Sequence, residues 1–347
     1  EKIGGIRNWD YRFCWLRDAA MTIRAFFKLG YKKEAEAFLA WLLHSTRLSR
    51  PRLQVVYDVY GETGIREKEL EELEGYASSR PVRIGNNAKE QLQLDIYGEV
   101  VVAAFELLQH KGELDRQTRR MLTNIGNIVA SGWRRPDEGI WEPRSGRRHN
   151  TYSKAMCWVV LDLLIRMHHK GIIRVPEKHY LVERNAIRSE IEDKGYDKNL
   201  KSYVSHYGET AVDGSLLLLP IYGYRRFDDK RVISTCRRIE KVLGKNGLIY
   251  RYKTEDGLPE GEGAFGACSF WAVECTARRG EIREARQKFN HLLSYANDVG
   301  LFAEEIDMKS GAALGNFPQA FTHVALVNAA VALSGHGNEE EIVEDEP

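Results

Sequence analysis

Two carboxyl groups stand out because of the residues around them. Glu142 follows a tryptophan in the glycine-flanked stretch DEGIWEPRSG (137–146), and Glu304 lies in GLFAEEID (300–307). An indole that partly excludes water raises the pKa of a carboxyl group, so the group keeps the proton that a general acid must donate. A carboxylate near an arginine or solvent stays ionised and can act as a general base. Two such groups on opposite sides of a glycosidic bond are sufficient to hydrolyse it.

Side chains that could hold a sugar occur in the same kind of segment. Aromatic rings stack on the apolar C–H face of a pyranose, and charged side chains form hydrogen bonds with its hydroxyl groups. For Arg17 and Asp18, the alternative is an ion pair at the start of a helix, stabilised by the helix dipole. The candidates for sugar contacts are Trp9, Tyr11, Trp15, Arg17, Asp18, Trp141, Arg251 and Tyr252.

Hydrophobic periodicity predicts two alternating kinds of helix that would position these residues. One kind is apolar nearly all round, which is typical of a helix buried on every side, and the other is apolar on one face. The buried helices are predicted at roughly 15–29, 98–109, 154–167, 214–222, 266–277 and 318–333, and the amphipathic helices at roughly 33–47, 114–131, 178–194, 228–243 and 281–296.

This repeat of helix pairs fits two all-α architectures. One is an open solenoid of stacked hairpins, and the other is a closed toroid with the apolar helices inside. In a ring, all loops from an outer helix to the next inner helix open at the same end, and these loops carry Glu142, Glu304 and the sugar-binding candidates. The long irregular excursion over residues 48–92 is expected to be functional as well.

The composition excludes several classes of partner. Lys and Arg number 51 and Asp and Glu number 50, and a net charge of +1 gives no overall field for nucleic acid or an anionic membrane. There is no 18-residue apolar run that would predict a membrane span. Five widely spaced cysteines indicate free thiols in a reducing, cytoplasmic compartment.

We expect no cofactor and no metal site. The histidines are scattered, and the stretch GEGAFG (261–266) matches a nucleotide-binding pattern without the preceding strand that this pattern requires. It is interpreted as a turn before a buried helix.

Five blocks of the sequence resemble, in order, the signature blocks of the glucoamylase-like glycoside hydrolases of family 15, in their bacterial and archaeal form. The resemblance runs from residue 1 to about residue 335. The blocks are NWDYRFCWLRDAAMTIRAFFKLGY, SSRPVRIGNNAKEQLQLDIYGEV, DEGIWEPRSGRRHNTYSKAMCWV, EGAFGACSFWAVE and GLFAEEID with LGNFPQAFTHVALVNAA.

The resemblance implies an (α/α)6 toroid and an inverting, exo-acting hydrolase that releases glucose from the non-reducing ends of α-glucans or oligosaccharides. It makes Glu142 the general acid and Glu304, rather than the adjacent Glu305, the general base. Inversion requires room for a water, which places the two carboxyl groups roughly 6.5–9.5 Å apart.

The resemblance also assigns the predicted substrate-binding residues. Arg17 and Asp18 would hold the glucose O4 and O6 in the first subsite, and Tyr11 would lie close to the scissile bond. Arg251 would bind a sugar, while Trp15 and Trp141 would form walls of the pocket.

Relatives of this type carry a β-sandwich domain and a linking helix before the first block, and neither is present in this sequence. A six-pair toroid needs twelve helices and the pattern predicts eleven, so the first outer helix is expected to be missing. We predict a catalytic domain over 1–335 and an acidic tail over 336–347. Apolar surface left uncovered by the missing helix could be covered in a homodimer.

Three alternatives remain open at this stage. A trehalase of the same family would use the same two carboxyl groups on a trehalose substrate. A non-catalytic toroid would bind carbohydrate without hydrolysing it. A helical-repeat scaffold would have open ends and would leave Asp18, Glu142, Arg251 and Glu304 dispersed.

Overall fold

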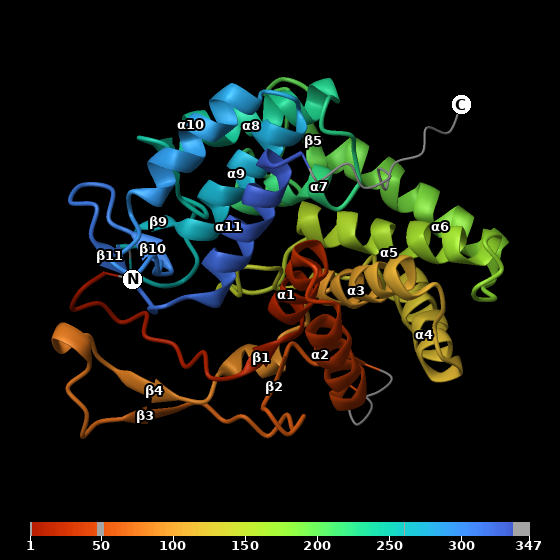
Figure 1. The fold of residues 1–347 in the computed structure, drawn as a ribbon, viewed down its shortest axis with the longest axis horizontal. Coiled ribbons are helices and arrows are strands. Elements are labelled where there is room, and N and C mark those ends of the chain that lie inside the picture. Colours follow the sequence, from red (N-terminus) through yellow and green to blue (C-terminus); the bar gives the residue numbers. More distant parts are fainter. Residues whose placement is uncertain (1, 47–51, 260, 336–347) are drawn as a thin grey trace.

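Six buried elements form a closed inner ring in the computed structural model, which describes residues 2–46, 52–259 and 261–335 (Figure 1). Each element contacts the next, and the last contacts the first. The open solenoid and the open-ended scaffold are therefore wrong, and the predicted (α/α)6 arrangement is confirmed. The inner elements are α1 (Leu16–Leu29), α3 (Asp95–Lys111), α5 (Thr151–His169), a 3-10 helix (Gly214–Leu217) continued by α7 (Leu218–Ile221), α9 (Gly266–Arg278) and α11 (Ala320–Leu333).

Five helices of the described chain pack outside this ring: α2 against α1, α4 and α6 against α5, α8 against the 3-10 helix, and α10 against α9. Asp115 and Asp229 begin two of them, because each carboxylate accepts hydrogen bonds from backbone N–H groups of the first turn. The outer helices are α2 (Lys32–Ser45), α4 (Arg116–Gly132), α6 (Glu177–Glu190), α8 (Lys230–Leu243) and α10 (Ile282–Leu293).

The inner helix α11 is apolar along its length, as predicted, yet it is incompletely covered. Leu326, Val327, Val331 and Leu333 are only partly buried. Among residues 2–46, 52–259 and 261–335, no outer helix lies between α11 and α1, and the homodimer stays a prediction.

The helix predicted at 214–222 is shorter and less regular than expected. Pro220 lies inside this segment and has no backbone N–H to donate, so a continuous α-helix is disfavoured. The chain instead forms a 3-10 turn capped by Asp213, followed by the single turn of α7. The inner position is filled all the same, because Leu216–Leu219 are fully buried.

The strands are short and belong to the loops. The pairs β1–β2, β3–β4, β5–β6 and β7–β8 are antiparallel, as is a three-stranded sheet in the order β11–β10–β9. Their bounds are β1 (Cys14–Trp15), β2 (Val56–Tyr57), β3 (Lys68–Leu70), β4 (Val82–Ile84), β5 (Tyr196–Asp197), β6 (Ser202–Tyr203), β7 (Gly244–Lys245), β8 (Leu248–Ile249), β9 (Ala264–Phe265), β10 (Glu305–Ile306) and β11 (Ala313–Leu314).

All five cysteines are free thiols, and four of them are buried, as predicted. Among the described helices, none has the length and apolar character needed to cross a membrane. The tail predicted over 336–347 lies outside the described residues.

Close packing of α3 against α5 depends on Gly98. A Cβ at this position would lie 2.7 Å from Cε and 3.1 Å from the carbonyl oxygen of Met156. We expect Gly98→Ala to destabilise the fold by about 1 kcal/mol or more despite the better helix propensity of alanine. Gly132→Ala is the matched control, because nothing lies within 4 Å of a Cβ there. Urea unfolding measures both, and equal stability of the two variants would contradict the packing argument.

Candidate active site

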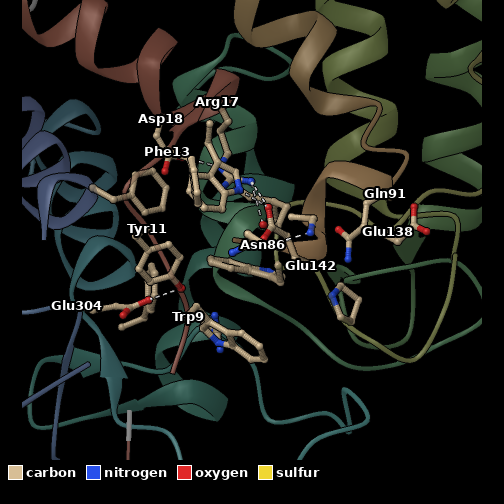
Figure 2. Close-up of a pocket in the computed structure, with 18 of the residues that line it drawn as sticks. Trp9, Tyr11, Phe13, Arg17, Asp18, Asn86, Gln91, Glu138, Glu142 and Glu304 are labelled. Atoms are coloured by element: carbon tan, nitrogen blue, oxygen red, sulfur yellow. Dashed lines mark hydrogen bonds and ion pairs between the residues drawn. The ribbon is translucent and has the colours of Figure 1, made fainter. Parts of the chain in front are cut away.

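A cavity of about 600 Å³ opens among the loops at one end of the ring. Figure 2 shows side chains from the N-terminal segment, the 138–142 loop and the 304 region pointing into the same space. All eight predicted site residues line it: Tyr11, Trp15, Arg17, Asp18, Trp141, Glu142, Arg251 and Glu304. The topology therefore brings together residues up to 293 positions apart in the chain.

The loop that carries Glu142 is closed at its base by backbone hydrogen bonds. Asp137 and Arg148 exchange two N–H···O=C bonds, both of 2.9 Å. The buried Asp137 carboxylate also accepts from the backbone N–H of Leu94, just before α3. Glu142 itself has φ of 56°, a left-handed conformation that costs energy for a residue with a side chain. The anchored loop holds this strained residue at the cavity.

Hydrogen bonds to the Glu142 carboxyl converge on one oxygen. Trp15 Nε1 donates to Oε1 at 2.8 Å and Gln93 Nε2 donates to the same atom at 3.0 Å, while Arg17 Nη1 lies 3.9 Å away. Burial is the largest effect and raises the pKa of Glu142, although these three neighbours oppose the rise. The raised pKa agrees with the sequence expectation, but the indole that bonds the carboxyl is that of Trp15, whereas Trp141 was expected to desolvate it.

Arg17 and Asp18 do form the ion pair considered as an alternative, with Nε–Oδ1 at 2.9 Å, and both also line the cavity. Arg17 further donates to the carbonyl oxygen of Ile140 at 3.0 Å. Behind it, in the first turn of α3, Asp95 is fully buried, and burial raises its pKa to about 8. Arg17 thus connects the start of α1 to the Glu142 loop.

A small sheet positions Glu304. Its backbone N–H donates to Asn316 and its carbonyl accepts from Gly266, which ties it to the segments that begin α11 and α9. The next residue, Glu305, starts β10 between β9 and β11. Successive side chains of a strand point to opposite faces, and accordingly Glu304 lines the cavity while Glu305 bonds the backbone N–H of Gly263.

Donors surround the Glu304 carboxylate. The Tyr11 hydroxyl donates to Oε1 at 3.0 Å (Figure 2). The backbone N–H of Asn316 donates to Oε2 at 3.2 Å. Glu304 was expected to lie near an arginine or in open solvent. Instead it is 2% exposed, and its carboxyl group accepts hydrogen bonds from a tyrosine hydroxyl and a backbone amide. These hydrogen bonds fix the orientation of the carboxyl group at the cavity.

Arg251 and Trp141 lie in the wall, and their contacts are mostly with protein. The Arg251 guanidinium binds both oxygens of the buried Glu262, with Nε–Oε2 at 3.0 Å. Trp141 makes edge contacts with Tyr252 and Phe265, at ring distances of 6.2 and 5.6 Å. Both side chains are thereby held rigidly at the cavity surface.

Residue-by-residue reasoning missed Gln93 and Asp95. Both lie in the stretch EQLQLDIYGEV, which belongs to a block that carries the family resemblance. An amide and an acid before an apolar helix look like capping residues. Only the resemblance of the whole block to the family could have indicated that Gln93 and Asp95 belong to the site.

No group of three or more His, Cys, Asp or Glu side chains in the described chain is arranged to hold a metal ion. The carboxyl groups at the cavity instead have arginine, tyrosine, tryptophan or amide partners. These side chains can transfer protons and form hydrogen bonds with hydroxyl groups.

A ring of helix pairs with two acids at one end is an arrangement used by glycoside hydrolases. Similarity to known proteins shows to which family of these enzymes the chain belongs. The sequence profile of glycosyl hydrolases family 15 matches residues 4–331, so the chain belongs to this family.

Two similar proteins are called trehalases. One, from Thermoplasma volcanium, is 37% identical over 96% of this chain and 53% of its own length. The other, from Mycobacterium tuberculosis, is 39% identical over 94% of this chain and 49% of its own length. The chain thus spans about half the length of these curated relatives.

Among solved structures, a bacterial glucoamylase complexed with acarbose superposes with a TM-score of 0.73 over 94% of this chain and 49% of that chain. The two sequences are 14% identical, so the likeness supports the fold alone.

The buried neighbour of the candidate base should make stability depend on pH. Burial raises the pKa of Glu305 from 4.5 to about 8, and its Oε1 has no hydrogen-bond partner among the described residues. The folded protein binds this proton more tightly than the unfolded chain, so the contribution to stability is complete below about pH 4.5 and is lost as the pH rises through about 8. As the pH rises, the free energy of unfolding of wild type should therefore fall relative to that of Glu305→Gln, by on the order of 1 kcal/mol or more.

Urea unfolding near pH 5 and near pH 8.5 measures this difference. The exposed substitution Glu113→Gln serves as the control and should follow wild type. If the difference in the free energy of unfolding between wild type and Glu305→Gln is the same at both pH values, Glu305 does not carry the proton.

Proposed function

We propose that this domain hydrolyses α,α-trehalose by a single displacement with inversion at the attacked carbon. The observation that carries the proposal is that Glu142 and Glu304 line one cavity in two different settings. Burial raises the pKa of Glu142, while Glu304 accepts hydrogen bonds from the Tyr11 hydroxyl and from the backbone N–H of Asn316. These are the settings that a general acid and a general base require.

In the proposed reaction, Glu142 donates its proton to the oxygen that joins the two glucose units. Trp15 and Gln93 both bond Oε1, so the proton resides on Oε2, and the anchored loop keeps that atom oriented. Arg17 lies close enough to stabilise the carboxylate left behind, since its Nη1 is 3.9 Å from Oε1.

Glu304 removes a proton from the water that attacks the anomeric carbon on the opposite face. The Tyr11 hydroxyl bonds its carboxylate and restricts its rotation. Arg17 and Asp18 are proposed to hold the hydroxyl groups of the first glucose.

The relatives decide which substrate is proposed. Sequences 32–39% identical over most of this chain are called trehalases, which favours the trehalase alternative over the first prediction of a glucoamylase-like activity on α-glucans. The bacterial glucoamylase shares the fold, and hydrolysis of α-glucan ends remains the second candidate. Free buried thiols support a reducing, cytoplasmic location.

Product stereochemistry tests the mechanism. Inversion at one carbon of trehalose releases one β-glucose and one α-glucose, so proton NMR should show equal amounts before mutarotation; release of α-glucose alone would contradict inversion. Glu142→Gln and Glu304→Gln should each reduce the rate about 10²–10⁴-fold. Full activity in either variant would refute the assigned roles, and faster release of glucose from maltose or soluble starch would favour the second candidate.

The pH profile tests the setting of the acid. The hydrogen bond from Gln93 lowers the pKa of Glu142 against the effect of burial, so Gln93→Leu should raise it. The alkaline limb of kcat/KM, where the acid loses its proton, should then move to higher pH. The exposed substitution Gln117→Leu should leave the limb unchanged. A shift to lower pH in Gln93→Leu would show that another group controls this limb.

A further inference from the structure

A cluster of four side chains joins three loops at the outer part of the cavity. The guanidinium carbon of Arg144 lies over the Trp9 ring at 4.4 Å from its centroid, and that of Arg83 lies over the same ring at 4.7 Å. Glu67 binds Arg144, with Nη2 at 3.1 Å from both carboxylate oxygens, and its Oε1 is 3.8 Å from Arg83 Nε. We call Glu67, Arg83, Arg144 and Trp9 the Glu67 cluster.

The Glu67 cluster is connected to both carboxyl groups of the proposed mechanism. Arg144 is two residues after Glu142 in the same anchored loop, and Trp9 is two residues before Tyr11, which bonds Glu304. Glu67 belongs to the excursion over residues 48–92, which also contributes Asn86 and Gln91 to the lining of the cavity. Its side chain is 9% exposed, so its charge is largely shielded from solvent and held among the two arginines.

Trp9 and Arg144 line the cavity at a distance from the residues proposed to hold the first glucose. In Figure 2, Trp9 lies beyond Tyr11, on the side away from Arg17 and Asp18. A sugar bond between Glu142 and Glu304 would therefore have its leaving sugar on the Trp9 side. The Arg144 side chain is 40% exposed and can present N–H donors there.

We propose that Trp9 and Arg144 form the subsite for the leaving glucose, and that Glu67 is the positioning residue that fixes both. The guanidinium of Arg144 offers N–H donors to adjacent hydroxyl groups, and the Trp9 ring on which it lies fixes its plane at the cavity. Because Trp9 and Arg144 are charged or aromatic groups held by contacts among three loops, this subsite selects a leaving group by the positions of its hydroxyl groups. This inference rests on the proposed function and specifies which residues choose its leaving sugar.

Two substrates separate this role from general structural damage. Trehalose has a leaving glucose, whereas α-glucosyl fluoride has a leaving group of one atom that needs no second sugar subsite. For Arg144→Ala and Glu67→Gln, kcat/KM on trehalose should fall about tenfold or more, since hydrogen bonds to charged groups are lost or misplaced. On α-glucosyl fluoride the same variants should stay within about twofold of wild type.

The matched control is Arg134→Ala. Arg134 also lies over a tryptophan, Trp133, at 4.3 Å and pairs with a glutamate, Glu183, at 2.7 Å, but it does not line the cavity. This variant should retain the wild-type kcat/KM on both substrates.

Each outcome decides the proposal. Equal losses on both substrates in Arg144→Ala and Glu67→Gln would mean that the cluster only supports the fold, and unchanged trehalose hydrolysis would mean that it does not contact the leaving sugar. Either result overturns the inference. If wild type hydrolyses α-glucosyl fluoride and maltose but not trehalose, the proposed substrate is wrong, and the same comparison with maltose in place of trehalose still tests the subsite.

Discussion

Closure of the inner ring is the constraint on which the rest of the structure depends. Contact of α11 with both α9 and α1 fixes the loops before α1, α9 and α11 at one end of the molecule. Glu304 is bonded to the segments that lead into α9 and α11, and Tyr11 reaches it from the segment before α1. If the ring were open, these segments would not be held next to one another, and Tyr11 could not form its hydrogen bond with Glu304.

The two candidate carboxyl groups differ because different kinds of backbone present them. Glu142 lies in a loop whose strained, left-handed backbone turns the side chain under Trp15 and Gln93, where burial favours the neutral acid. Glu304 precedes a strand, and the alternation of side chains along the strand separates it from Glu305. Two chemically identical groups thus acquire different hydrogen-bond partners from local geometry.

The helices were predictable because their signal is local, and much of the site was not. Periodicity located the five outer and six inner positions to within a few residues, with the segment around Pro220 as the exception. The same periodicity described the inner helices as apolar, yet Arg24, Glu99 and Glu106 are buried within the ring. Glu99 accepts hydrogen bonds from two tyrosine hydroxyls, and Arg24 pairs with Glu106 at 3.2 Å. Such partners are distant in sequence, so no local pattern reveals them.

The candidate site shows the same limit. Residue type and the family blocks identified Glu142 and the residues that line the cavity, but Trp15 was predicted as a wall rather than as the donor to Glu142. The excursion over residues 48–92 could be recognised as functional from its length and from the family block that begins at residue 78. Its Glu67 acquires a role because Arg144 is fixed by the loop of the candidate acid and Trp9 by the segment of Tyr11. Specificity for a leaving group can therefore change through the excursion while the ring that positions Glu142 and Glu304 stays the same.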